Sequence, residues 1–358
     1  MTDKPDALII LTPGFPENEA ESTCIPPQQI FVRALKENNP RLNIIVLTFQ
    51  YPFFSAKYQW YGVDVVSFGG KDKGRVYRKL TGIRVWAELK KIHKSYNIIG
   101  LLSFWIGKCA FIGNWFAEKY HLKHYTWILG QDAKAGNKYV KKIKPPGKTL
   151  IALSDFIARE FHKNYGILPL HIIPVGIDAS LFANVISEKN IDIMGAGSLI
   201  PLKQYEVFIE AVNLLKKDFP DINTCVCGEG PEMARLQEMI TAMSLQDNIR
   251  LLGLQPHLQV LAVMQKSKVF LHTSSYEGFG AVCLEALYAG AHVVSFVKPM
   301  DANIENWNIA NDKENMVQIL TNILKNPGSE YRSVFPYSIH DNAEAAIKLF
   351  DYKLAAIS

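Results

Sequence analysis

The chain has 358 residues, of which 48% are hydrophobic and 20% are charged, a balance that excludes a disordered protein and favours two globular domains. No run of about 20 uncharged apolar residues occurs in it, so the sequence predicts no transmembrane helix. The net charge of +5 is unevenly divided, because residues 1–175 carry +12 and the remainder carries −7. The basic first half predicts an anionic partner or surface.

The amino-terminal segment and the cysteines indicate a reducing compartment. Acidic residues interrupt the first residues of the chain, and the apolar run there is too short for a secretory signal. The five cysteines form no disulfide or metal-binding framework, and Cys225 and Cys227 are interpreted as small buried residues on one face of a strand. We therefore expect a cytoplasmic protein.

Apolar strands and helical patterns alternate through the first half. Strands are predicted near 7–11, 43–49, 98–103, 124–128 and 149–152, and helices at 26–38, 76–94, 107–120 and 155–164. Alternation of this kind predicts a parallel sheet with helices on both faces. Pro174 and Gly176 then break the pattern, which places the end of the first domain at residue 175.

Residues 71–94 are unusually basic, with nine Lys and Arg, and they carry Val76, Leu80, Ile83 and Ala87 at helical spacing. Such a helix is typical of peripheral contact with the anionic inner face of a membrane, at about 1 kcal/mol for each basic group near the surface. The alternative is a surface helix that packs its apolar stripe on the sheet. Since no nucleic-acid recognition motif accompanies the charge, we expect no nucleic-acid partner.

A second alternating pattern begins at Ile191. Strands are predicted near 191–195, 223–227, 249–252, 269–272 and 292–296, and helices near 203–217, 231–243, 257–265 and 280–289. The sequence therefore predicts an α/β protein with two doubly wound, Rossmann-like domains, at 1–175 and 176–335, that face a cleft lined by strand ends. In the tail, 336–358, residues 342–357 form an amphipathic helical pattern.

Two glutamates flank a glycine loop in the second domain. The strand-like run Val269–Leu271 is followed by Glu277, the loop Gly278-Phe279-Gly280, and a helical pattern that contains Glu285. Glycines at a helix start let backbone N–H groups approach an anion, and the helix dipole favours negative charge there. This arrangement indicates a diphosphate site, with Glu285 available to the sugar hydroxyl groups of a nucleotide.

This segment resembles the signature of retaining glycosyltransferases of the GT-B fold, in particular glycosyltransferase family 4. Glu277-Gly278-Phe279-Gly280 and Glu285 match the family pattern without a gap. The resemblance implies that Glu277 and the loop amides face the donor sugar, that Glu285 binds the donor ribose, and that the final helix crosses back to the first domain.

Other segments match the same family in the expected order. The loop from Ile193 to Lys203 resembles a phosphate-binding segment whose lysine is Lys203, although Ser198 replaces the usual arginine. Gly253 belongs to a loop that would contact the nucleotide base or form a structural turn. Gly195-x-Gly197 lacks a third glycine at Ile200, so a dinucleotide-binding oxidoreductase is not expected.

The first domain carries weaker matches. Gly14 follows the first strand, where the family has a glycine loop near donor phosphate and acceptor. Asp132, in Gly130-Gln131-Asp132, would position a hydroxyl group or cap a helix. The family histidine that reaches the reacting sugar is replaced by Leu129.

The resemblance thus implies a retaining, hexosyltransferase-type enzyme that moves a sugar from a UDP or GDP donor to a glycan or lipid-linked acceptor. Glu277 and Asp132 are the predicted catalytic residues. No Asp-x-Asp motif or His/Cys ligand cluster is present, so we expect no metal and no further cofactor. Two alternatives stay open, a non-catalytic sugar-nucleotide-binding relative and a sugar-nucleotide epimerase of similar build.

Overall fold

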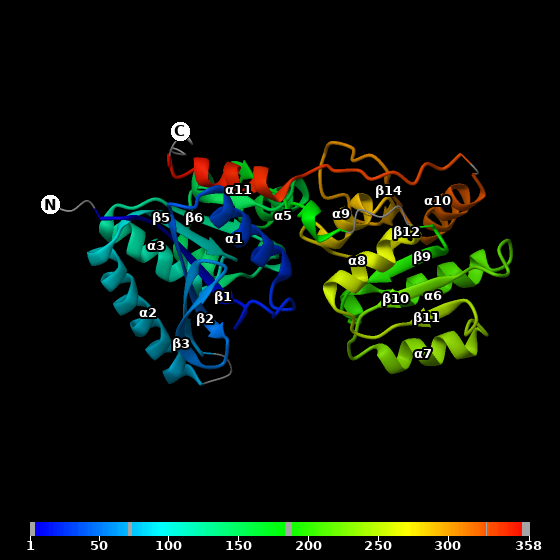
Figure 1. The fold of residues 1–358 in the computed structure, drawn as a ribbon, viewed down its shortest axis with the longest axis horizontal. Coiled ribbons are helices and arrows are strands. Elements are labelled where there is room, and N and C mark those ends of the chain that lie inside the picture. Colours follow the sequence, from blue (N-terminus) through cyan, green and yellow to red (C-terminus); the bar gives the residue numbers. More distant parts are fainter. Residues whose placement is uncertain (1–3, 71–73, 183–187, 327, 353–358) are drawn as a thin grey trace. The chain divides into compact units, whose positions relative to one another are not determined.

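The computed structural model describes residues 4–70, 74–182, 188–326 and 328–352. Two compact units make up the chain (Figure 1). Unit 1 comprises Met1–Gly176 and Ile339–Ser358, and unit 2 comprises Ile177–Ser338. The predicted boundaries, after residues 175 and 335, lie within three residues of this division.

Unit 1 is built on an eight-stranded sheet in the order β3-β4-β2-β1-β5-β6-β7-β8, which is parallel except for β3. Its strands are β1 (Asp6–Gly14), β2 (Asn43–Tyr51), β3 (Ser55–Trp60), β4 (Val63–Phe68), β5 (Asn97–Phe104), β6 (His124–Ile128), β7 (Leu150–Ala152) and β8 (His171–Ile172). Its helices are α1 (Pro26–Asn38), α2 (Arg75–Ser95), α3 (Lys108–Tyr120), α4 (Lys138–Ile143), α5 (Asp155–Tyr165) and α11 (Ile339–Lys348).

The core of unit 1 follows from continuous apolar strands, which parallel sheets bury on both faces. Ile9 of β1 packs in one cluster with Val85 of α2 and Phe116 of α3, so α2 and α3 cover one face. On the other face Phe31 of α1 packs edge-on against Trp127 of β6, with the ring centroids 4.6 Å apart. Helices therefore lie on both faces, as the alternating pattern predicts.

The hairpin β3–β4 was not anticipated by the alternating pattern. Its turn is Tyr61-Gly62, where both residues have positive φ values, of 43° and 73°. A two-residue turn of this kind matches the twist of antiparallel strands. The exposed and half-buried alternation of β3 shows an edge strand and not a buried parallel one.

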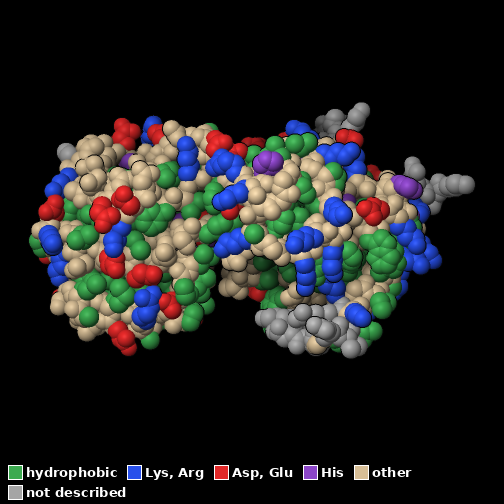
Figure 2. Space-filling view, turned by 180° about the vertical axis from the view of Figure 1, so that it is seen from behind, with side chains coloured by type: hydrophobic (Ala, Val, Ile, Leu, Met, Phe, Trp, Pro, Cys, Tyr) green, Lys and Arg blue, Asp and Glu red, His purple; other side chains and the backbone are tan. Residues whose placement is uncertain are grey.

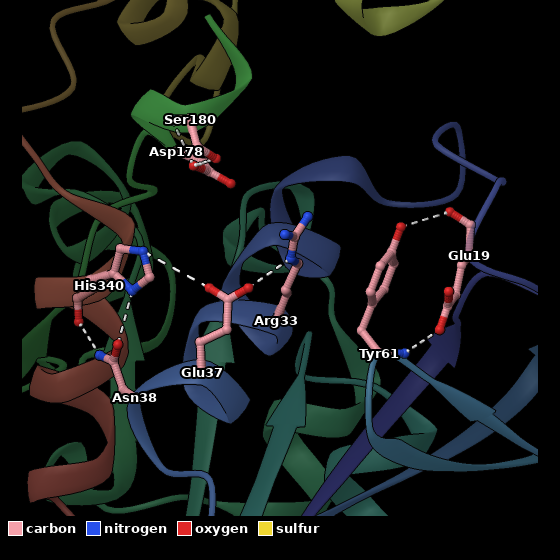
Figure 3. Close-up of polar contacts among 8 residues, drawn as sticks. All are labelled: Glu19, Arg33, Glu37, Asn38, Tyr61, Asp178, Ser180 and His340. Atoms are coloured by element: carbon pink, nitrogen blue, oxygen red, sulfur yellow. Dashed lines mark hydrogen bonds and ion pairs between the residues drawn. The ribbon is translucent and has the colours of Figure 1, made fainter.

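The carboxyl-terminal helix α11 packs on α1 within unit 1. Figure 3 shows His340 of α11 beside Asn38 and Glu37 of α1: His340 Nδ1 lies 2.8 Å from Asn38 Oδ1, and Asn38 Nδ2 donates to the His340 carbonyl oxygen at 2.9 Å. The predicted extent of this helix, 342–357, is wrong, because it begins at Ile339 and ends at Lys348. Asp351, in a turn beyond it, has a φ of 55° that an α-helix does not allow; residues 353–358 lie outside the described part.

Unit 2 is built on a six-stranded parallel sheet in the order β11-β10-β9-β12-β13-β14. Its strands are β9 (Ile191–Ala196), β10 (Thr224–Cys227), β11 (Ile249–Leu251), β12 (Ser267–His272), β13 (His292–Ser295) and β14 (Trp307–Ile309). Its helices are α6 (Tyr205–Leu215), α7 (Met233–Ala242), α8 (His257–Gln265), α9 (Ala281–Tyr288) and α10 (Lys313–Lys325). The fold prediction of two Rossmann-like α/β units is confirmed.

The two ends of unit 2 lie side by side. Ile177 and Ser338 form an isolated parallel bridge, and the Ile177 N–H donates to the Tyr337 carbonyl oxygen at 2.9 Å. Unit 2 is thus an insertion in unit 1 whose entry and exit strands pair with each other.

Candidate functional site

The carboxyl ends of β9 and β10 continue into two glycine loops that pass in direct contact. A Cβ atom on Gly228 would lie 1.9 Å from the Gly197 carbonyl oxygen, and one on Gly230 would lie 2.3 Å from the Leu199 carbonyl oxygen. Leu199 N donates to the Glu229 carbonyl oxygen at 2.8 Å. No side chain larger than hydrogen fits at these crossings, so the glycines fix the course of the loop that carries Lys203.

The structure brings Lys203 and Glu277 together, although they are 74 residues apart in the chain. Lys203 ends the short 3-10 helix η4 (Pro201–Lys203), and its ammonium group contacts Glu277 Oε1. Thr273 Oγ1 donates to the Lys203 carbonyl oxygen at 2.7 Å, and Ser275 N donates to the Leu202 carbonyl oxygen at 3.2 Å. These bonds hold the loop after β9 on the loop after β12, with both charged side chains less than one-fifth exposed.

His272, the last residue of β12, is next to Glu277 of this pair. Its Nε2 is 3.3 Å from Glu277 Oε1, and the residue is almost completely buried. Burial favours the neutral form of Glu277, but His272 and Lys203 outweigh it and lower the pKa of that carboxyl group to about 2. Burial also lowers the pKa of His272. Near neutral pH the site therefore holds an ionised carboxylate beside a neutral imidazole.

The predicted glycine loop forms the start of α9. Gly280 occupies the N-cap position with a φ of 85°, a conformation suited to glycine, and no side chain caps the helix. Phe279 is buried and packs edge-on against Trp307 and Tyr337, at centroid distances of 6.0 and 5.8 Å. Phe279 thus anchors the loop, while the first N–H groups of α9 provide a local positive potential beside Glu277.

Glu285 lies inside α9, and its hydrogen-bond partner is not one of the residues that match the family motif. His257 Nε2, at the start of α8, lies 2.8 Å from Glu285 Oε1. This hydrogen bond raises the pKa of His257 against the opposing effect of burial. Gly253, four residues earlier, has a φ of 68° and accepts a bond from Gly228 N at 2.8 Å. The loop after β11 therefore adjoins the loop after β10.

Sequence reasoning missed His257 and His272 as members of the site. His272 closes the strand that leads to the motif, and His257 opens a predicted helix directly after the Gly253 loop. Both positions are strand or helix ends, which is the only signal the sequence offers. Ser198, which is predicted to bind the nucleotide-sugar donor, is exposed on the loop after β9.

Asp132, the predicted catalytic residue of unit 1, accepts hydrogen bonds from the backbone. Asp132 Oδ2 accepts from Ile106 N at 2.9 Å, and its Oδ1 accepts from Leu129 N at 3.1 Å and Gly130 N at 2.9 Å. Burial raises the pKa of Asp132 to about 6, although these backbone donors oppose the shift. Both oxygens thus connect the loop after β5 with the loop after β6, which favours the structural interpretation.

Gly14 and Leu129 add little to a site in unit 1. A Cβ on Gly14 would make an ordinary 3.5 Å contact with Cys24 Sγ, so packing does not require glycine there. Leu129 is buried, with 8% of its surface exposed.

Among the residues that the structure describes, no group of three or more His, Cys, Asp or Glu is arranged to hold a metal ion. Within the same residues, no helix has the length and apolarity needed to cross a membrane.

Comparison with known proteins finds glycosyltransferases. Residues 177–335 match the family model described as "Glycosyl transferases group 1". The chain is 31% identical over 127 residues to a phosphatidylinositol N-acetylglucosaminyltransferase of Arabidopsis thaliana, a match that covers 35% of this chain and 28% of that protein. It is 32% identical over 127 residues to the GtfA component of a UDP-N-acetylglucosamine–peptide N-acetylglucosaminyltransferase of Streptococcus parasanguinis, covering 36% and 25%. The matches thus span about a quarter of each of these relatives' length.

Solved structures extend the similarity to the whole chain. A glycosyltransferase from Rickettsia africae superposes with a TM-score of 0.74 at 16% identity, covering 99% of this chain and 100% of that one. A sucrose-phosphate synthase from Thermosynechococcus elongatus superposes with a TM-score of 0.67 at 16% identity, covering 97% and 95%. The family match thus lies within unit 2, and the solved structures share the two-unit GT-B fold over nearly the whole chain.

Proposed function

We propose that this chain transfers a hexosyl group, with N-acetylglucosamine as the first candidate, from a nucleoside diphosphate sugar to a glycan or lipid-linked acceptor with retention of configuration. The observation that carries the proposal is the contact between Lys203 and Glu277 at the uncapped start of α9. A cation, a helix amino terminus and an ionised carboxylate within one loop cluster suit a diphosphate joined to a sugar.

Each group has a defined task in this reaction. The Lys203 ammonium group and the first N–H groups of α9 would bind the diphosphate and stabilise the negative charge that develops on it as the glycosidic bond breaks. Because Lys203 contacts Glu277 in the structure, the diphosphate must share this ammonium group with the carboxylate. Glu277 remains ionised because its pKa is about 2, so it can stabilise positive charge on the sugar ring in an oxocarbenium-like transition state.

Glu285 is assigned to the ribose of the donor. A carboxylate has two oxygens, each of which accepts more than one hydrogen bond. Glu285 can therefore receive ribose hydroxyl groups while it stays bonded to His257. The Gly253 loop is assigned to the base, which gives the nucleotide contacts from the ends of β9, β11 and β12.

The donor and the acceptor are proposed from the names of similar proteins. Several relatives carry N-acetylglucosaminyltransferase names, and one solved neighbour is a complex with UDP and glucose, which makes UDP-N-acetylglucosamine the donor to test first. One relative is named for phosphatidylinositol, and one solved neighbour is a complex with fondaparinux, α-GlcNAc-glycerol and UDP, so we assign a glycan or lipid-linked acceptor to unit 1. We propose a metal-independent reaction in which Lys203 and the α9 amides carry the charge stabilisation.

A thermal-shift series tests the donor site. We expect UDP and UDP-N-acetylglucosamine to raise the melting temperature by mass action, equally with and without EDTA, and more than GDP-mannose does. Lys203→Ala should remove most of this shift, whereas Lys217→Ala, at an exposed position of the same unit, should keep it. If no nucleoside diphosphate or nucleotide sugar stabilises the wild type, the donor-site proposal is wrong.

Product analysis tests transfer and retention. Incubation with UDP-N-acetylglucosamine should give transfer to an acceptor or slow donor hydrolysis, and the anomeric coupling constant of the product should show the configuration of the donor. A non-catalytic sugar-nucleotide-binding protein is the second candidate, because Leu129 replaces a histidine and backbone groups occupy both Asp132 oxygens. Donor binding without transfer or hydrolysis would favour it.

A further inference from the structure

Helix α2 packs on the sheet through residues other than the apolar stripe that its sequence shows. Thr81, Val85 and Leu89 are buried against the sheet, whereas Leu80 and Ile83 are 48% and 64% exposed. Val76, the first member of the stripe, has a side chain outside the described part. The interpretation of residues 71–94 as a helix that buries this stripe on the sheet is therefore wrong for Leu80 and Ile83. These two side chains are available for contact outside unit 1.

Helix α3 continues the exposed apolar surface. Trp115 is 57% exposed and Phe111 is 37% exposed, one helical turn apart. The ring of Trp115 lies 4.4 Å from that of Trp86 on α2, and a Cβ on Gly82 would be 3.5 Å from Ile112 Cδ1. The two helices are thus in close contact along this side. We call the surface formed by Leu80, Ile83, Trp86, Phe111 and Trp115 the aromatic face.

The aromatic face is surrounded by positive charge. Helices α2, α3 and α4 together contain twelve Lys and Arg and two Glu. Lys119 Nζ lies 5.9 Å from the Trp86 ring centroid, and Lys142 Nζ lies 5.9 Å from that of Phe111. Figure 2 shows blue Lys and Arg side chains beside green hydrophobic ones on the surface of unit 1.

The two acidic residues of these helices do not balance that charge. Glu88 contacts Lys57 and lies 3.6 Å from the Lys91 ammonium group, and Glu118 accepts a hydrogen bond from Asn114 at 2.9 Å. Both carboxylates therefore have local partners. The face presents exposed apolar groups inside a field of lysine and arginine.

We propose that the aromatic face docks unit 1 on the surface of a membrane that contains anionic lipids. Aromatic and aliphatic side chains enter the boundary between headgroups and acyl chains, where Trp is favoured, while long lysine stems keep their ammonium groups among the phosphates. A nucleic acid or an acidic peptide would use the charge but would leave Leu80 and Ile83 in water. A lipid surface uses both properties, and it explains why several large apolar side chains are exposed on strongly basic helices.

Co-sedimentation with vesicles tests the proposal on the full chain. We expect binding to vesicles of phosphatidylcholine with about one-third phosphatidylglycerol, and binding to pure phosphatidylcholine that is weaker by about fivefold for each basic group engaged. Ile83→Ser and Trp115→Ser should each reduce the partition coefficient about tenfold. Lys79→Ser with Lys90→Ser, at two exposed positions, should reduce it for anionic vesicles only.

A matched variant separates docking from folding. Leu170→Ser changes a side chain of unit 1 that is 63% exposed and lies outside the aromatic face, so it should leave partitioning unchanged. Thermal unfolding should be the same for Ile83→Ser, Leu170→Ser and the double lysine variant, because each changes an exposed side chain, whereas Trp115→Ser also loses its contact with Trp86. Equal binding of the wild type and Ile83→Ser, or of anionic and neutral vesicles, would overturn the proposal. Binding to heparin or RNA without binding to vesicles would overturn it as well, in favour of a soluble polyanion.

Discussion

The two units differ in how their polar residues are used. In unit 2, Lys203, Glu277 and His272 meet at the ends of β9 and β12, and Glu285 of α9 pairs with His257 of α8. In unit 1, the one predicted acid, Asp132, is bonded to three backbone N–H groups. The difference teaches that a carboxylate in a loop at a strand end indicates chemistry only where side-chain partners accompany it.

The largest effect should come from Glu277→Gln, which keeps the shape and removes the charge. Loss of one group that stabilises transition-state charge typically costs about 10²–10³ in turnover. Donor affinity should change far less, because the Lys203 ammonium group remains. Turnover and donor affinity measured together check this, and an unchanged turnover would remove unit 2 from the chemistry.

The same variant should change the response to acid. The folded pKa of Glu277, about 2, lies below the ordinary value of 4.5. A carboxylate with a lowered pKa stabilises the fold above the ordinary value, and that contribution is lost as the pH falls toward the folded value. Acid unfolding of the wild type should therefore be steeper than that of Glu277→Gln between about pH 4.5 and 2.

Lys203→Ala should weaken donor binding about 10- to 100-fold, the equivalent of a charge-assisted hydrogen bond of about 1.5–3 kcal/mol. Titration calorimetry with UDP measures the change, and Lys217→Ala serves as its control. Lys203→Arg should recover only part of the affinity, since a planar guanidinium group does not reproduce a compact ammonium contact. Full affinity in Lys203→Ala would mean that the diphosphate binds elsewhere.

Asp132→Ala probes the other unit. Three backbone N–H groups would lose their acceptor, so we expect a loss of about 1–3 kcal/mol in unfolding free energy. Donor binding should be unaffected, because it depends on unit 2. A variant that unfolds like the wild type but loses turnover would reverse the comparison and make Asp132 catalytic.

The smallest expected effect concerns His257 and Glu285. The hydrogen bond to Glu285 raises the pKa of His257, and such a contribution to stability is complete below the ordinary value of 6.5 and lost as the pH rises through the folded value. His257→Gln should remove this pH dependence, a change of about 0.5–1.5 kcal/mol. Melting temperatures of both proteins between about pH 6 and 9 measure it; parallel curves would exclude the bond.

The parts of the structure that the sequence predicts are those with strong local patterns. The helix from 26 to 38 and the strands β9 and β12 follow from apolar periodicity, and the glycine loop before α9 follows from its motif. The hairpin β3–β4 escapes this reasoning although β3 alternates polar and apolar residues, because its turn begins with Tyr61, an uncommon residue at positive φ, and not with the Asn or Asp typical of such turns.

The side-chain contacts of the site could not be predicted from the sequence, because they depend on how the chain folds and not on local patterns. His272 lies five residues before Glu277, and nothing in that spacing places its Nε2 beside the carboxylate. His257 and Glu285 are 28 residues apart on different helices, and their contact depends on how α8 and α9 pack. Likewise, helical spacing identifies the stripe of α2 but not the side that faces the sheet, which the positions of Val85 and Leu89 decide.

The bridge between Ile177 and Ser338 gives the chain a modular architecture. Because unit 2 enters and leaves unit 1 at neighbouring backbone positions, a short linker in place of 177–338 could close unit 1 without stretching the chain. The excised segment would likewise have its ends next to each other. Exchange of whole units between related chains would need only these two joints, so unit 2 can change while the surface of unit 1 stays the same.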